Sequence, residues 1–343
     1  MITRRVFLAT PSLLAADLFG AEKDTRKIPT PQLEKLAAAA LREAAKHKAS
    51  YCDIRINRYR DQNLSMRLTP ERGTGKTMEV PAVSDRESFG FGVRVIVDGA
   101  WGFASSPNVT QEEIARITAE AVTVARANAM VKDKPVILAP TKSFRDRWVS
   151  RFEKNPFDAP IEEKLTLLRE AAAEAKKGKH VFTAMAGLNF HSEDKYFASS
   201  EGSSIQQFIV QTFPALLANA VDISKGLSRN RSYMPAPLLT GYEYVPKINL
   251  KENAQRIREE VAEHLAAPAV TPGKKDLVLL PSHLFLTIHE SIGHSTELDR
   301  ALGYEANFAG TSFLTTNKMG KERVGSDAVT IYGDRTMPEG LAT

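Results

Sequence analysis

Apolar residues recur along the chain with two different periods, and the change of period separates predicted helices from predicted strands. Segments 30–49, 110–129, 161–177 and 249–268 repeat apolar residues every three or four positions, which predicts amphipathic helices. Apolar and polar residues tend to alternate in segments 51–68, 87–107 and 181–222, which predicts strands joined by turns. This mixture indicates an α+β fold in which helices pack on antiparallel sheets.

Three local signals refine this pattern. Segment 51–68 reads as a strand, a turn and a second strand. In segment 87–107, Asp98 and Gly99 separate two alternating runs, which predicts a hairpin turn. Thr110 stands three residues before Glu113 at the start of a helix, the spacing of a capping box.

The predicted elements divide the chain into three domains. An N-terminal α+β domain covers 30–135, a Pro-rich passage follows, and a middle α+β domain covers 145–265. A third domain covers 271–343, with a short buried strand at 276–280, a helix beginning at Pro281 and a strand-like run in 329–335. This third domain ends without a closing element, which predicts that it is truncated.

Residues 1–21 have a different character. Arg4 and Arg5 precede an apolar stretch, 6–19, that is too short for a stable transmembrane anchor. The sequence around the two arginines is typical of a twin-arginine signal, which predicts export of a folded protein to the periplasm. A frayed amphipathic N-terminus on a cytoplasmic protein is the alternative. No other segment is apolar enough to anchor the chain in a membrane.

Composition narrows the function classes. The chain has 343 residues, 43% hydrophobic and 25% charged, with a net charge of +5, as in ordinary globular proteins. Basic residues mostly neighbour acidic ones, so no stripe for nucleic acid is present. Cys52 is the single cysteine. A disulfide framework and a four-cysteine zinc site are therefore excluded, and its place on an alternating strand indicates a structural role.

The segment HESIGH, residues 289–294, carries candidate metal chemistry. His289 and His294 are five residues apart, which sets their side chains about 140° apart on a regular helix. They can bind one metal only if the helix contains an extra residue, and we predict a bulged or broken turn at 291–293. Gly293 makes such a turn inexpensive. Glu290 then adjoins the metal and can take a proton from water, as in zinc hydrolases.

The same residues also allow a simpler interpretation. By composition, an HExxxH pattern arises by chance in roughly one chain of this length in a hundred, and two histidines on an amphipathic helix need bind nothing. The remaining histidines lack ligand spacing, which indicates structural or solvated positions: His47, His180, His191, His264 and His283.

Further motifs support the metal interpretation. The segment DLVLLPSHLFLTIHESIGHSTELDRALGYEANFAG contains H-E-x-x-G-H-x-x-E-x-D and then F-A-G at 308–310. It resembles the TldD/PmbA family of metalloproteases. SFGFGVRVIVDGAWGFASS is similar to the hairpin of the family's first domain, and YFASSEGSSIQQF to a middle-domain segment with an S-E-G turn. The resemblance covers most of residues 30–340.

The resemblance implies a particular subunit and site. It implies the active, HExxxH-bearing, TldD-like subunit, with His289 and His294 as Zn²⁺ ligands and Glu290 as the catalytic carboxylate. It also implies a third ligand, a cysteine late in the last domain, which this sequence does not contain. Glu297 and Asp299 match the family pattern; such acids either orient a ligand or are helix-end charges.

The resemblance also implies substrates and partners. We expect hydrolysis of peptides or unfolded polypeptide segments by a complex with a TldE/PmbA-like paralogous subunit, or by a homo-oligomer. One alternative function is a non-catalytic or incomplete subunit that serves assembly or binding, because two histidines alone hold zinc weakly. A hydrolase with another metal is a further alternative, since imidazole binds several metals.

Overall fold

The computed structural model describes residues 31–341, so the predicted signal at 1–21 lies outside the described residues. The chain divides into two compact units, Met1–Ala266 with Thr336–Thr343 and Ala267–Arg335. Within 31–341, no helix has both the length and the apolar character needed to cross a membrane.

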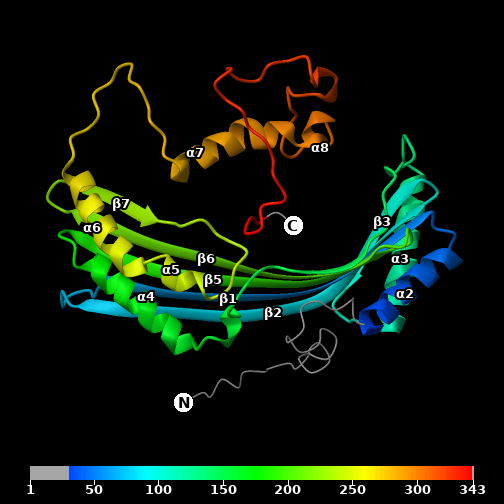
Figure 1. The fold of residues 1–343 in the computed structure, drawn as a ribbon, viewed down its shortest axis with the longest axis horizontal. Helices are drawn as coiled ribbons and strands as arrows, with labels where there is room; N and C mark the ends of the chain where they lie inside the picture. The colour runs from blue at the N-terminus through cyan, green and yellow to red at the C-terminus, as the bar shows by residue number, and fades with distance from the viewer. Residues whose placement is uncertain (1–30, 342–343) are drawn as a thin grey trace. The chain divides into compact units, whose positions relative to one another are not determined.

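The first unit is built on one seven-stranded sheet (Figure 1). Its strands pair in the order β3-β2-β1-β5-β6-β4, and β7 also pairs with β6. All pairs are antiparallel except β4 with β6. The strand bounds are β1 (Tyr51–Pro70), β2 (Thr77–Val97), β3 (Ala100–Ser106), β4 (Arg145–Val149), β5 (Val181–Ser199), β6 (Ser204–Asp222) and β7 (Leu227–Tyr233). With the helices, this confirms the α+β fold class.

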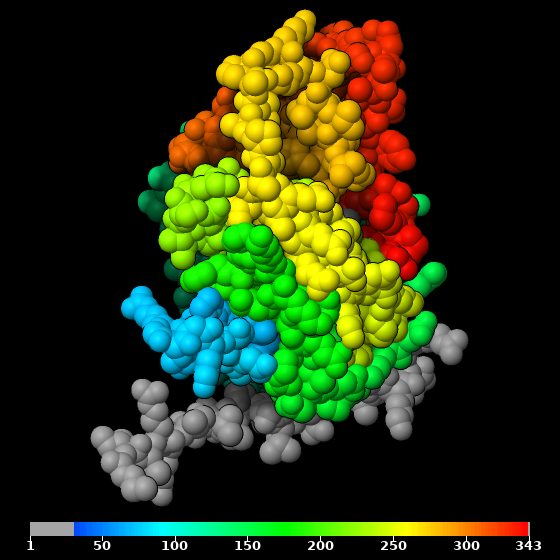
Figure 2. Space-filling model, turned by 90° about the vertical axis from the view of Figure 1, so that its left-hand side faces the viewer, coloured from blue at the N-terminus to red at the C-terminus, as the bar shows by residue number. Residues whose placement is uncertain are grey.

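Helices cover one face of the sheet at its two ends. The helix bounds are α2 (Pro31–Lys46), α3 (Gln111–Ala129), α4 (Ile161–Lys176), α5 (Tyr244–Lys247) and α6 (Leu250–Ala266), with a 3₁₀ turn at Pro156–Asp158. One core joins α2 and α3 to residues such as Ile54 and Val93. A second joins α4 and α6, which lie side by side in Figure 2, to residues such as Met66 and Leu188. Burial of these apolar side chains drives both packings.

The predicted N-terminal and middle domains, 30–135 and 145–265, share this sheet instead of having one each. β1 pairs with β5 from Asp53 to Leu68, so the pairing runs without a break between the two parts. Each part has its own hydrophobic core, and the long strand β1 contributes residues to both cores. The proposed domain boundaries stay a prediction.

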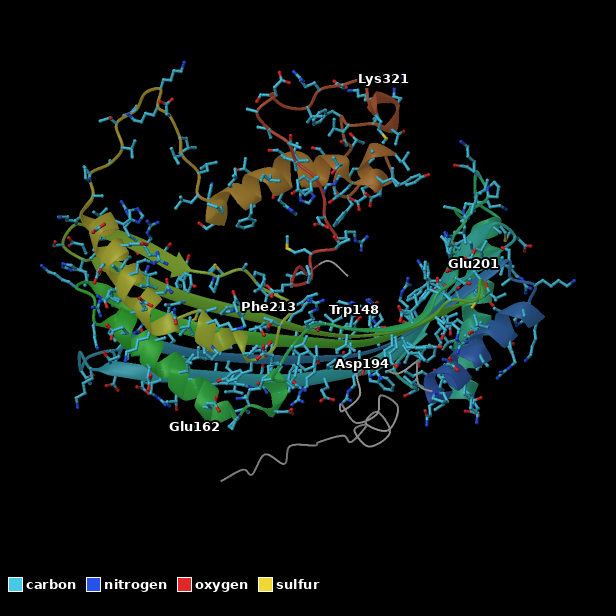
Figure 3. The ribbon with its side chains drawn as sticks, in the orientation of Figure 1. Trp148, Glu162, Asp194, Glu201, Phe213 and Lys321 are labelled. Carbon is cyan, nitrogen blue, oxygen red and sulfur yellow. The ribbon has the colours of Figure 1, made fainter. Side chains whose placement is uncertain are left out.

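Among the described residues of this unit, no helix packs on the opposite face of the sheet. Side chains alternate between the two faces of a strand, so Ile54 and Ile56 face the helices while Arg55 and Asn57 face the other way. In Figure 3, Phe213 of β6 lies on this open face, away from α4. We call this the open face.

The strand–turn–strand prediction for 51–68 is wrong, because these residues form the single strand β1. Its central residues 61–63 pair with β2 on one side and with β5 on the other. Ladder hydrogen bonds on both sides satisfy the backbone, so polar side chains that suggest a turn remain extended. The predicted hairpin turn is confirmed, with φ of 50° at Asp98 and 74° at Gly99.

The predicted capping box is half formed. The Thr110 hydroxyl accepts a hydrogen bond from the Glu113 N–H at 3.2 Å, which caps α3. The Glu113 carboxylate does not return to Thr110; it accepts bonds from Ser106 and Arg116. Because Ser106 and Arg116 already donate to the Glu113 carboxylate, the second hydrogen bond of the capping box does not form.

The first unit also buries a lysine. Lys164 is fully buried, and its Nζ donates to Gln62 Oε1 at 2.5 Å and to the Pro156 carbonyl at 2.6 Å. The rings of Phe190 and Tyr242 lie within 4.9 and 5.8 Å of the same atom. All these partners are neutral, and burial lowers the pKa of Lys164 from 10.5 to about 8.

This lysine predicts a pH dependence of stability. Between about pH 8 and 10.5 the unfolded chain binds the lysine proton more strongly, so stability contributed by Lys164 rises with pH. From pH 7 to pH 9, the unfolding free energy of the wild type should therefore rise by about 1 kcal/mol relative to Lys164→Met. Denaturant titrations at both pH values measure this, with Lys177→Met at the exposed end of α4 as control. Parallel pH curves for wild type and Lys164→Met would contradict it.

The second unit has little regular structure. Its elements are α7 (Pro281–Ile288), a π-helical turn (His289–Gly293), a 3₁₀ turn (His294–Thr296), α8 (Leu298–Ala301) and a 3₁₀ turn (Thr316–Lys318). The helix begins at Pro281, as predicted. The apolar side chains of this helix are exposed, with 63% of Phe285 accessible.

The two strands predicted in this unit are wrong. Residues 276–280 and 329–335 adopt no strand, and Val278 is 86% exposed. A strand needs a neighbouring strand to satisfy its backbone, and no segment within 267–335 forms one.

Candidate metal centre

A π-helical turn connects α7 to the two histidines of HESIGH. The His294 N–H donates to the His289 carbonyl, a hydrogen bond that spans five residues instead of four. The bulged turn predicted at 291–293 is therefore confirmed. Gly293 has an ordinary helical φ of −54°, and a Cβ there would lie 3.6 Å from His289 Nδ1. The glycine gives room beside the imidazole, but the turn does not require its conformational freedom.

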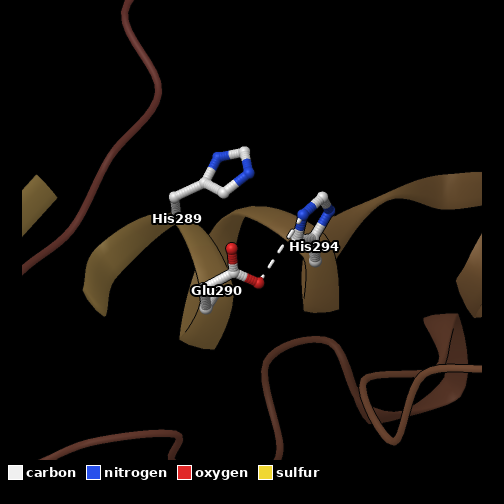
Figure 4. A group of neighbouring side chains, drawn as sticks. All are labelled: His289, Glu290 and His294. Carbon is white, nitrogen blue, oxygen red and sulfur yellow. Dashed lines mark ion pairs between the residues drawn. The ribbon is translucent and has the colours of Figure 1, made fainter. Parts of the chain in front are cut away.

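The extra residue brings both imidazoles to one side of the helix, as Figure 4 shows. The ring centroids of His289 and His294 are 4.3 Å apart, with the planes at 69°. His289, Glu290 and His294 each offer one donor atom, and these atoms lie within 4.8 Å of one another. A Glu290 carboxylate oxygen is 3.8 Å from His294 Nε2. Donor atoms this close can share one ion.

Glu297 fixes the second histidine. Its Oε1 lies 2.8 Å from His294 Nδ1, and its Oε2 lies 2.6 Å from Arg300 Nε. The bond to His294, supported by Arg300, lowers the pKa of the Glu297 carboxyl although partial burial opposes this. A carboxylate can only accept, so Nδ1 is the donor of this bond, which leaves Nε2 as the nitrogen that could bind a metal.

The sequence left two roles for Glu297 and Asp299, and the structure separates them. Glu297 contacts the imidazole, whereas Asp299 accepts a hydrogen bond from the Arg300 N–H at the start of α8. Sequence reasoning missed Arg300 altogether. The sequence did hold a sign of the Glu297–Arg300 ion pair, because residues three apart lie together on a helical turn.

The other candidate donors lie elsewhere. Cys52 is 1% exposed in the core of the first unit, and burial raises the pKa of its thiol to about 12. It is therefore a neutral thiol, unlike a metal-ligating thiolate. His47 pairs with Glu43, and His191 with Asp61. Within 31–341, none of the five other histidines belongs to a group that could hold a metal.

The residues present fit part of a catalytic metal site. Two imidazoles on one side, one oriented by a carboxylate, match the ligand type and support that zinc sites use. Glu290 offers a carboxylate beside them. Among the described residues, no cysteine or further histidine joins this cluster. His289 and His294 therefore account for two of the ligands that a metal ion would need.

Comparison with known proteins finds similarity to metalloproteases. Residues 52–125 match the sequence profile of a domain described as PmbA/TldA metallopeptidase domain 1. A metalloprotease of Methanothermobacter thermautotrophicus is 29% identical over 290 residues, 84% of this chain and 58% of that protein. A metalloprotease of Methanocaldococcus jannaschii is 27% identical over 290 residues, with the same shares. The chain thus spans 58% of the length of both relatives.

Solved structures share the fold. A modulator of a DNA gyrase from Thermotoga maritima superposes with a TM-score of 0.52 at 17% identity, over 70% of this chain and 50% of that one. A protein of the same description from Bacteroides thetaiotaomicron gives 0.54 at 13%, over 70% and 52%. These comparisons support the resemblance of this chain to the TldD/PmbA family of metallopeptidases, whose first domain residues 52–125 match.

Proposed function

We propose that this chain is the TldD-like, HExxxH-bearing subunit of a zinc-dependent metallopeptidase. The proposal rests chiefly on the π-helical turn, which places His289 and His294 on one side of the helix with Glu290 between them. The proposed substrates are peptides or unfolded polypeptide segments, in keeping with the metalloprotease relatives.

Each residue has a definite task in this proposal. His289 and His294 would hold the metal, and Glu297 keeps Nε2 of His294 directed to it. The metal, when bound, supplies Lewis acidity that brings the pKa of water to about 7. The Glu290 carboxylate takes the proton of the attacking water and passes it to the leaving amine. Hydrolysis of a fluorogenic peptide by the zinc-loaded protein, alone and co-purified with a paralogous subunit, tests this function.

The proposal for Glu297 predicts a loss of metal affinity. Glu297→Ala removes the acceptor of the His294 Nδ1 proton, so the dissociation constant for Zn²⁺ should rise about 10- to 100-fold. Glu297→Gln keeps an acceptor and should give a smaller rise. Titration against a competing chelator measures both, with Glu322→Ala as the control, because the ion pair of Glu322 among the described residues is with Lys318. Unchanged affinity in Glu297→Ala would contradict the positioning role.

The location of the protein and its assembly are proposed from its sequence. We propose export to the periplasm through the twin-arginine segment, and a complex with a TldE/PmbA-like paralogue or a second copy. A second candidate function is a non-catalytic assembly subunit. It is favoured by the exposed apolar residues of α7, among them Phe285 and Leu286, since such surfaces often mark protein contacts. Peptide hydrolysis that depends on Glu290 separates the two candidates.

A further inference from the structure

A hollow of about 550 Å³ lies on the open face of the sheet, over β1, β2 and β3. Arg55 and Asn57 of β1 stand opposite Gly92 and Gly90 of β2. Glycine has no side chain, so neither glycine projects atoms into the space above β2. Phe103 of β3 borders this space, since a Cβ on Gly92 would lie 2.9 Å from its ring. The volume is typical of small-ligand sites.

The charged side chains that line this β1–β3 hollow are arginines. Two arginines and no acidic residue are among the described residues that line it. Arg94 is committed to the buried Asp53 carboxylate through contacts of 2.6, 3.0 and 3.2 Å. Arg55 reaches the same carboxylate once, at 3.4 Å, and its side chain is 43% exposed. Most of its N–H donors therefore remain for an anion, and a guanidinium suits a carboxylate because two parallel bonds can form.

One residue that lines the hollow, Asn57, also has an unsatisfied acceptor. Asn57 Nδ2 donates to Glu193 Oε1 at 3.2 Å and to the Tyr59 hydroxyl. Since Glu193 can only accept, it fixes the orientation of the amide. Asn57 Oδ1 is then buried without a hydrogen-bond partner among the described residues. A buried acceptor without a donor is unfavourable, so an N–H from a ligand would satisfy it.

We propose that the β1–β3 hollow binds the carboxyl-terminal residue of a peptide. Its carboxylate pairs with Arg55, the N–H of its last peptide bond donates to Asn57 Oδ1, and its side chain rests on Phe103, which is 57% exposed. Arg55 and Asn57 are two residues apart on one strand, about 7 Å. One residue with a hydrogen bond of about 3 Å at each end spans that distance. Assigning the carboxylate to a peptide rests on the proposed peptidase function.

Calorimetric titration tests the proposal with the full chain carrying Glu290→Gln, which prevents hydrolysis. The probes are acetyl-Ala-Ala-Phe with a free carboxylate and the same peptide as its amide. The acid should bind at least about tenfold more tightly. Arg55→Gln should remove this preference. Arg58→Gln is the matched control, because it lies on the same strand but on the other face, paired with Glu87.

Two results would overturn the proposal. Equal binding of acid and amide would show that Arg55 does not bind the carboxylate. Acetate competing as strongly as the tripeptide would show a simple anion site. Hydrolysis by the wild type is measured separately. A lost acid preference with intact Glu290-dependent hydrolysis removes this inference alone, and lost hydrolysis with an intact preference removes the proposed function alone.

Discussion

Glu290→Gln should lower the rate of peptide hydrolysis by about 10³-fold while Zn²⁺ remains bound. The amide keeps the size of the side chain but cannot take a proton from water, and a positioned base contributes roughly 10²- to 10⁴-fold. Glu290 is not needed to orient His294, because Glu297 holds that ring. Metal affinity should therefore change little. Steady-state assays with a fluorogenic peptide, together with zinc titration, measure both quantities.

A matched control makes this result specific. Glu322→Gln removes the charge of a carboxylate in the same unit, and its partner Lys318 is remote from the histidines in sequence. We expect wild-type hydrolysis from this variant. If Glu290→Gln hydrolyses peptide as fast as Glu322→Gln, the proposed role of Glu290 is wrong.

His289→Ala and His294→Ala should each abolish stable zinc binding. The cluster offers only two imidazoles, so removing one leaves a single strong ligand where catalytic zinc sites use three. The zinc content of protein equilibrated with excess zinc should fall from about one ion per chain to nearly none. Elemental analysis by mass spectrometry measures this content.

The control for this loss is His283→Ala. His283 lies in the first turn of the same helix, and it belongs to no candidate metal group within 31–341. Its substitution should leave the zinc content unchanged. Equal zinc content in His283→Ala and the two ligand variants would contradict the assignment.

The sequence predicted the local elements of the fold better than their assembly. The helices and the Asp98–Gly99 hairpin follow from periodicity and turn chemistry that act over a few residues. The continuous strand β1 does not, because it depends on pairing with β5, more than 100 residues later in the chain. Residues 276–280 were predicted to form a strand and do not. Their apolar run resembles a buried strand, but no strand edge in the second unit pairs with it.

The candidate site was predictable to a similar extent. The five-residue spacing of His289 and His294 required an extra residue in the helix, and the π-helical turn supplies it. Glu297 stands three residues after His294, the spacing of neighbours on a helical turn, but the same position also suits a helix-end charge, so the sequence left both roles open.

The most direct test of the metal centre is X-ray absorption at the zinc edge of the zinc-loaded protein, with His289→Ala alongside. We predict two imidazole nitrogens at about 2.0–2.1 Å from the metal in the wild type, and at most one in the variant. A wild-type spectrum without imidazole ligands, or one that His289→Ala leaves unchanged, would contradict the account.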